Sequence, residues 1–146
     1  MRILIHVALL LALVLCHACG LKSKQDNTTI EEQGMEVSEV LVAELTEGAT
    51  SEVLADFGVV EPRSISSLDI RIVNTTDSPI VLLDYETTCR CTTLEFDRTP
   101  IAAGGEAVAV LTFDSRGEWG SVGNFLSIET SNEECAVVVW MSAHIE

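Results

Sequence analysis

Three cysteines in the second half of the chain carry the side chains best suited to chemistry. Cys89 and Cys91 are two residues apart, and Cys135 lies near the end of the sequence. In an extended segment, side chains at i and i+2 point to the same face, so the pair can act together. Thiols at this spacing can form a disulfide, exchange with other thiols, or bind a soft metal ion.

The spacing leaves three states of these cysteines open. One member of the pair could bridge to Cys135, and closing a loop of roughly 45 residues contributes about 4 kcal/mol in the chain-entropy model. Alternatively, Cys89 and Cys91 bridge each other in a small, easily reduced ring, or the pair binds Cu(I) or Zn. Arg90 between them favours a thiolate neighbour and therefore redox chemistry.

The sequence offers too few additional ligands for a metal site and too few additional residues for a catalytic site. His144 is the single histidine beyond the N-terminal segment, and two thiolates do not complete a tetrahedral zinc site. Ser115 and Ser121 lie outside any G-x-S-x-G elbow. The sequence therefore predicts no metal, no cofactor and no enzymatic activity. Trp119, in a glycine-flanked turn, is either a contact residue for sugar or protein, together with Arg90, or packs onto the end of the fold.

The charge of the chain excludes several classes of partner. Among 146 residues there are 8 Lys and Arg against 23 Asp and Glu, a formal net charge of -15. Such a chain has no basic stripe to displace counterions from nucleic acid, and no basic patch for anionic lipid. Aromatic residues make up 5% of the chain, so a base-stacking platform is not expected either.

The first residues predict export and a membrane anchor. Met1 and Arg2 precede Ile3–Leu15, in which 12 of 13 residues are apolar, too short a stretch to span a bilayer but typical of a signal peptide. Ala18-Cys19-Gly20 is similar to the centre of bacterial lipoprotein signals, which implies cleavage after residue 18 and lipidation, palmitate included, of Cys19. The alternative is an ordinary signal peptide cut near Ala18 or Gly20.

Residues 19–53 are expected to form a polar tether, because their composition buries too little apolar area to offset chain entropy. Within it, residues 37–45 fit either a helix or a strand. Asn27 and Asn74 begin N-x-T sequences, which we interpret as polar tether and turn residues rather than glycosylation sites.

Residues 54–146 are expected to form the folded domain, because apolar residues there recur with a period of two. Turn signals such as Asn74–Pro79 separate the apolar segments. About seven short strands without a helical pattern predict an all-β, immunoglobulin-like β-sandwich. The expected strands include 68–72, 80–85, 92–96, 107–113, 122–130 and 135–141.

Five ordered motifs in this region resemble the domain of unknown function 1573 family, a group of short, often lipid-anchored, extracytoplasmic bacterial proteins with immunoglobulin-like domains. The resemblance covers residues 54–146 and implies the same fold and the same extracytoplasmic location. The motifs are Asp56–Val60, Asn74–Ile80, Cys89–Thr92, Pro100–Gly104 and Thr112–Gly117.

Three residues depart from the family pattern. Arg90 replaces the glycine of C-G-C-T, Ala103 replaces a proline, and Asn124 stands where the family often has lysine. Arg90 has less access to positive φ than glycine, so any chemistry of the cysteine pair that needs such a backbone would be lost.

Together these observations predict a non-enzymatic, lipid-anchored module of the cell envelope of a Gram-negative, Bacteroidetes-like bacterium, facing the periplasm or the cell surface. Its expected partner is another envelope protein or a glycan, bound through strand edges or through the loops around Cys89–Cys91 and Trp119. The alternative function is thiol redox chemistry or soft-metal handling by Cys89 and Cys91.

Overall fold

The computed structural model describes residues 40–146 of the chain. This part of the chain contains eight strands and no helix. The strands are β1 (Leu41–Leu45), β2 (Ala49–Val60), β3 (Ile65–Asn74), β4 (Leu82–Thr87), β5 (Thr92–Phe96), β6 (Glu106–Asp114), β7 (Gly120–Thr130) and β8 (Cys135–Ile145). Over the same residues, no helix is long and apolar enough to cross a membrane.

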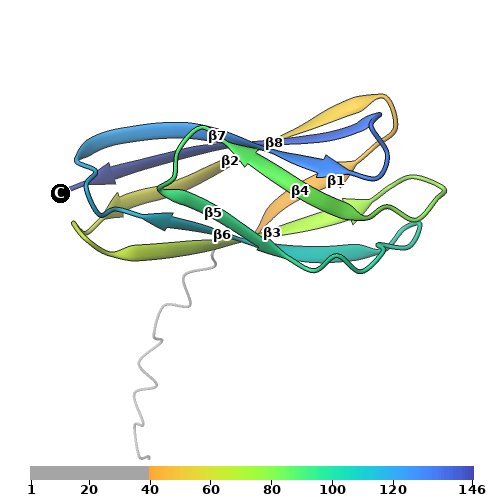
Figure 1. Ribbon diagram of the computed structural model, residues 1–146, viewed down its shortest axis with the longest axis horizontal. Coiled ribbons are helices and arrows are strands. Elements are labelled where there is room, and N and C mark those ends of the chain that lie inside the picture. Colours follow the sequence, from red (N-terminus) through yellow and green to blue (C-terminus); the bar gives the residue numbers. More distant parts are fainter. Residues whose placement is uncertain (1–39) are drawn as a thin grey trace, which may run out of the picture. The chain divides into compact units, whose positions relative to one another are not determined.

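The strands form two four-stranded sheets that pack face to face, as the two layers in Figure 1 show. One sheet has the order β1-β3-β6-β5 and the other the order β2-β8-β7-β4. Two pairs are parallel, β1 with β3 and β2 with β8, and the other pairs are antiparallel. The all-β sandwich predicted from the two-residue periodicity is therefore confirmed.

Alternation along the strands places the core between the sheets. In β8 every second residue from Cys135 to Ile145 is buried, and in β6 the buried residues are Ala109, Leu111 and Phe113. Because successive side chains of a strand point to opposite faces, this pattern gives each sheet one apolar inner face. The two inner faces bury each other, which removes apolar area from water and stabilises the sandwich.

Five connections carry the chain from one sheet to the other, and two of them join edge strands. The turn between β1 and β2 joins edge strands of different sheets on one side of the sandwich, and the segment between β4 and β5 does the same on the opposite side. A crossover at an open edge must reverse the chain within a few residues. The segment between β4 and β5 contains Cys89, Arg90 and Cys91.

The predicted boundary of the folded domain was wrong at its N-terminal end. Residues 41–45 and 49–53, expected to belong to the tether, form β1 and the first half of β2. The ambiguous segment 37–45 is a strand from Leu41 onward. The acids of these segments lie on the outward side of the strands, while apolar residues lie on the inward side. Ala43, Leu45 and Val53 are buried, whereas Glu44 and Glu52 are exposed. The expected signal peptide, Cys19, Asn27 and most of the expected tether lie outside the described residues.

Candidate functional site

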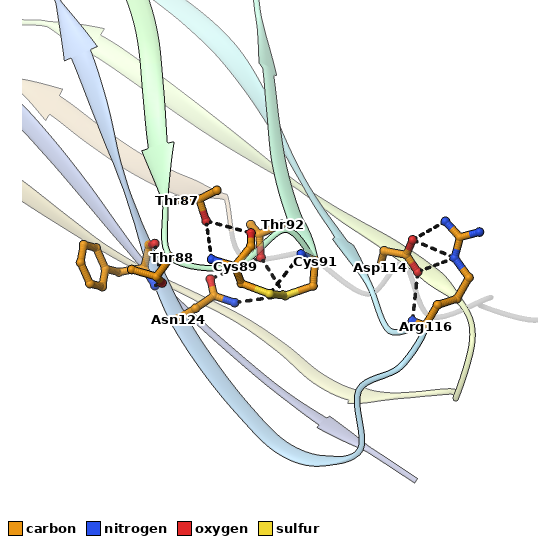
Figure 2. Close-up of a disulfide and its surroundings, with 9 residues drawn as sticks. Thr87, Thr88, Cys89, Cys91, Thr92, Asp114, Arg116 and Asn124 are labelled. Carbon is orange, nitrogen blue, oxygen red and sulfur yellow. Dashed lines mark hydrogen bonds and ion pairs between the residues drawn. A yellow bond between two sulfur atoms is a disulfide. The ribbon is translucent and has the colours of Figure 1, made fainter.

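The crossover between β4 and β5 carries a disulfide between Cys89 and Cys91, whose Cα atoms are 5.2 Å apart. Both cysteines are half-buried, and Arg90 between them is exposed. Figure 2 shows the disulfide in the loop between the two strands. The predicted alternative in which the two cysteines bridge each other is the one found in the structure, and solvent can reach the bridge.

Each sulfur of the disulfide receives an N–H group. The backbone N–H of Cys91 donates to Sγ of Cys89 over 3.0 Å, and Nδ2 of Asn124 in β7 lies 3.5 Å from Sγ of Cys91. Oγ1 of Thr92, a buried residue, donates to Oδ1 of Asn124 over 3.3 Å. The two contacts of Asn124 join β7 to the crossover loop and to the start of β5 in the other sheet (Figure 2).

A second loop, residues 115–119 between β6 and β7, lies beside the disulfide. The N–H of Asp114 donates to the carbonyl of Cys91 over 2.8 Å, so the end of β6 is fixed to the crossover. Buried Ser115 donates from Oγ to the carbonyl of Glu61 over 2.8 Å and accepts from the N–H of Ser64 over 2.9 Å. Ser115 therefore has a structural role, holding the second loop against the turn between β2 and β3.

An ion pair supports the same loop from the outside. The guanidinium of Arg116 contacts both carboxylate oxygens of Asp114, with Nε at 2.9 and 2.8 Å (Figure 2). The side-chain hydrogen bond from Arg116, together with its backbone N–H and its charge, holds the pKa of Asp114 below the usual range of a carboxyl. Arg116 is exposed and Asp114 is partly exposed, so water screens the pair and it contributes little to global stability.

The second loop brings a carboxylate to the disulfide. One oxygen of Glu118 and the sulfurs of Cys89 and Cys91 all lie within 4.8 Å of one another. The next residue, Trp119, is 82% exposed, so its ring does not pack onto the end of the sandwich. Sequence analysis missed Glu118, because it lies far from the cysteines along the chain and no motif marks it.

Arg90 fits the crossover without backbone strain. Among the described residues, the only non-glycine residue with positive φ is Arg63. The arginine that replaces the family's glycine therefore does not have to enter the left-handed region.

Cys135 is separate from the pair. It lies at the start of β8, is 2% exposed and is not bridged. Burial, with the nearby charges of Glu47 and Glu134, raises the pKa of its thiol. The predicted alternative of a bridge from the pair to Cys135 is not what the structure shows, and Cys135 serves as a small apolar core residue.

A second polar group lies on β7 and β8. Oγ of Ser121 is 3.0 Å from Nδ1 of His144, its cross-strand partner, and Nε2 of His144 is 3.4 Å from Glu146. These three residue types are those of a serine–histidine–carboxylate catalytic triad. However, the side chains of His144 and Glu146 are 47% and 68% exposed, so water surrounds the imidazole and weakens any electrostatic stabilisation of a transition state.

The outer face of the β2-β8-β7-β4 sheet carries an apolar row. Leu54, Trp140 and Phe125 occupy paired positions on three neighbouring strands. Their exposed fractions are 75%, 44% and 39%. The rings of Trp140 and Phe125 are 5.2 Å apart, so part of each ring is covered by the other.

Comparisons with known proteins support this fold. Residues 49–145 match the family described as "Protein of unknown function (DUF1573)". A structure of a protein of unknown function from Porphyromonas gingivalis W83 is similar with a TM-score of 0.56 and 20% identity; the match covers 76% of this chain and 50% of that one. The chain thus spans about half the length of that protein. No match was found among curated proteins.

The ASH/PapD-like domain 7 of human CEP192 is similar with a TM-score of 0.52 and 11% identity, over 64% of this chain and 80% of that domain. Two packed, mostly antiparallel sheets and the similarity to a PapD-like domain define an immunoglobulin-like β-sandwich. The chain belongs to the DUF1573 family, as its five motifs predicted.

Proposed function

We propose that this protein is a non-enzymatic, lipid-anchored binding module of the bacterial envelope. The observation that carries the proposal is the meeting of two loops at one end of the sandwich. There Glu118 lies beside the half-buried disulfide of Cys89 and Cys91, and the exposed residues Arg90 and Trp119 are their neighbours along the chain. We call the surface of these residues the crossover face. An exposed tryptophan and an arginine are the residue types that most often dominate binding surfaces.

The anchor rests on the sequence around Cys19. Several acyl chains on that residue would give lasting attachment, since each buried CH2 contributes about 0.8 kcal/mol. The intact mass of the protein from membranes, before and after reduction and alkylation, tests this part. A diacyl or triacyl mass that is lost in Cys19→Ser supports the anchor. An unlipidated, soluble wild-type protein contradicts it.

The absence of enzymatic activity is part of the same proposal. The described residues offer Ser121, His144 and Glu146 as the nearest approach to a catalytic set, and they lie open to water. Hydrolysis of an activated ester at the same rate by wild type and Ser121→Ala supports this part. A rate that falls about 100-fold or more in Ser121→Ala, the size expected for a lost nucleophile, contradicts it.

The binding role is tested with the two tryptophans of the chain. Cross-linking capture from envelope extract is compared for wild type, Trp119→Ala and Trp140→Ala. Trp119 lies on the crossover face, whereas Trp140 lies on the outer face of a sheet, so Trp140→Ala is the matched control. We expect Trp119→Ala to lose the captured partner and Trp140→Ala to retain it. Equal capture by wild type and Trp119→Ala, or no capture by wild type, contradicts the role of this face.

A second candidate function is thiol redox chemistry, which the solvent-accessible disulfide favours. A dithiol would attack one sulfur, form a mixed disulfide and release the other cysteine as a thiolate. The second thiol of the reductant would then complete its own disulfide. Exchange with a dithiol that stops in the double variant Cys89→Ser, Cys91→Ser supports this function, and the same exchange in that variant contradicts it.

A further inference from the structure

We propose that reduction of the Cys89–Cys91 disulfide creates a zinc site whose third protein ligand is Glu118. The proposal deepens the second candidate function and does not depend on partner binding by the crossover face. It rests on three ligand atoms, two sulfurs and one carboxylate oxygen, that lie within 4.8 Å of one another. These atoms come from two loops that the fold brings together at one end of the sandwich.

The distances suit a metal ion after reduction. Zinc binds thiolate sulfur at about 2.3 Å and carboxylate oxygen at about 2.0–2.2 Å in tetrahedral geometry, so neighbouring ligand atoms are about 3.3–3.8 Å apart. The released sulfurs and Glu118 reach this arrangement through side-chain rotation. The backbone is held in place by the bond from Asp114 N–H to the Cys91 carbonyl and by the Ser115 contacts.

The surroundings of the sulfurs favour thiolates. The Cys91 N–H and the Asn124 amide already donate to the two sulfurs, and the same donors would stabilise negative charge on them. Donors of this kind orient metal ligands and tune their affinity in other sites. Arg90 adds a positive charge beside the pair, which also favours the thiolate form.

The carboxylate of Glu118 is available to a cation. Among the described residues, the nearby cation Arg116 contacts Asp114, and no ion pair engages Glu118. Glu118 and both cysteines are half-buried, which leaves room for water as the fourth ligand. Three protein ligands with one water match the open class of zinc site. The oxidised protein cannot form this site, because its sulfurs are bonded to each other.

The reaction balances with a dithiol as reductant. The disulfide takes up two electrons and two protons and becomes two thiols, while the dithiol becomes a disulfide. Binding of Zn2+ then releases the two thiol protons as the Zn–S bonds form.

The test uses the full chain in detergent, with Cys16→Ser and Cys19→Ser to remove the thiols of the N-terminal region. The disulfide is reduced by a phosphine, which becomes a phosphine oxide and so separates this test from the dithiol exchange reaction. Zinc affinity is measured without oxygen by competition with a coloured chelator. Co2+ serves as a second probe, because its visible absorption is strong in tetrahedral sites and its near-ultraviolet absorption reports thiolate ligands.

We expect one zinc ion per reduced chain and none per oxidised chain. Glu118→Gln should lower the affinity about tenfold or more and weaken the tetrahedral Co2+ spectrum. The matched control Glu133→Gln removes an exposed acid from the turn between β7 and β8 and should leave the affinity unchanged. Far-ultraviolet circular dichroism confirms that each variant is folded.

Three results would overturn the proposal. The first is a reduced chain that takes up no more zinc than the double variant Cys89→Ser, Cys91→Ser. The second is an unchanged affinity in Glu118→Gln, which would leave a site of two thiolates alone. The third is an equal loss in Glu133→Gln, which would reduce the effect to the general negative charge of the chain. Failure of dithiol exchange alone contradicts only the second candidate function.

Discussion

The side-chain amide of Asn124 lies 3.5 Å from Sγ of Cys91 and links β7 to the crossover loop between β4 and β5. The same amide accepts a hydrogen bond from the hydroxyl of Thr92, which is 1% exposed. Asn124→Ala should therefore lower the free energy of unfolding by about 1–2 kcal/mol, because a buried hydroxyl loses its acceptor. Ser127→Ala, at an outward position of the same strand, is the control. Urea unfolding measures both, and equal losses in the two variants would refute the link.

The three cysteines of the described region should react in two distinct classes. After reduction under native conditions, we expect alkylation of Cys89 and Cys91, which solvent reaches. Cys135 should react only after unfolding, because it is 2% exposed and its pKa is raised by burial. Mass spectrometry of the alkylated peptides measures this difference. Native labelling of Cys135 together with a protected member of the pair would point to a different disulfide.

Much of the fold could be predicted from the sequence, because the core strands obey a two-residue period. Residues 68–72, 107–113 and 135–141 all lie in observed strands. β1 was left open between a helix and a strand, and the start of β2 was assigned to the tether, because their inward apolar residues, such as Ala43 and Val53, alternate with exposed acids. The average composition of the segment hides such a pattern. The parallel pairing of β1 with β3 and of β2 with β8 joins residues far apart in the chain, which no local pattern reports.

The candidate site was predictable only in part. Cys89, Arg90, Cys91 and Trp119 could be found by residue type, but not their meeting at one end of the sandwich. Glu118 approaches the two cysteines because the second loop carries it there, and Ser115 holds that loop in place. Contacts of this kind connect residues far apart in the chain, so no local pattern reports them.

Acid should weaken the contribution of the Asp114–Arg116 ion pair. The folded-state pKa of Asp114 is lowered below the ordinary value of an aspartate, first by the side-chain hydrogen bond from Arg116. A carboxyl with a lowered folded pKa stabilises the folded state above its unfolded pKa, and this contribution disappears as pH falls through the folded value. The difference in melting temperature between wild type and Asp114→Asn should therefore be constant near neutral pH and shrink below about pH 4.

The comparison with Asp114→Asn cancels other acids with lowered pKa values, among them Asp56 and Asp97. Added salt should also reduce the difference, because Arg116 is exposed and dissolved ions screen the pair. A difference that grows as the pH falls would show that the carboxylate does not act through this ion pair.

Asn74 should be the most sensitive polar residue of the turn between β3 and β4. It is fully buried, and Nδ2 donates to the carbonyls of Ser78 and Ile101 at 2.8 and 2.9 Å. Its Oδ1 accepts from the N–H of Thr76 over 3.0 Å. Asn74→Ala should cost about 2–3 kcal/mol of unfolding free energy, because buried backbone groups lose their partners.

Asp77→Ala is the control for Asn74, since Asp77 is exposed in the same turn. Chemical denaturation measures both variants, and we expect less than about 0.5 kcal/mol for Asp77→Ala. The buried amide of Asn74 also predicts that this residue carries no glycan, which intact mass checks. A stable Asn74→Ala variant would show that the turn holds without these bonds.

At the motif Asp56-Phe57-Gly58, β2 bulges out of register with β8. Gly58 has φ 63°, and its N–H donates to Oδ1 of Asp56 over 3.0 Å. No atom lies within 4 Å of a Cβ built at Gly58, so Gly58→Ala tests the backbone alone. The left-handed conformation costs a residue with a Cβ about 1–2 kcal/mol.

Gly123→Ala is the opposite case in β7. A Cβ there makes ordinary contact with the carbonyl of Met141 at 3.7 Å, and φ lies outside the left-handed region. Because glycine weakens a strand interior through its entropy, we expect Gly123→Ala to leave stability unchanged or raise it slightly. Urea unfolding of both variants separates strain from entropy. If Gly58→Ala is as stable as Gly123→Ala, the bulge tolerates an ordinary φ, and the glycine of this motif is retained for a reason other than backbone shape.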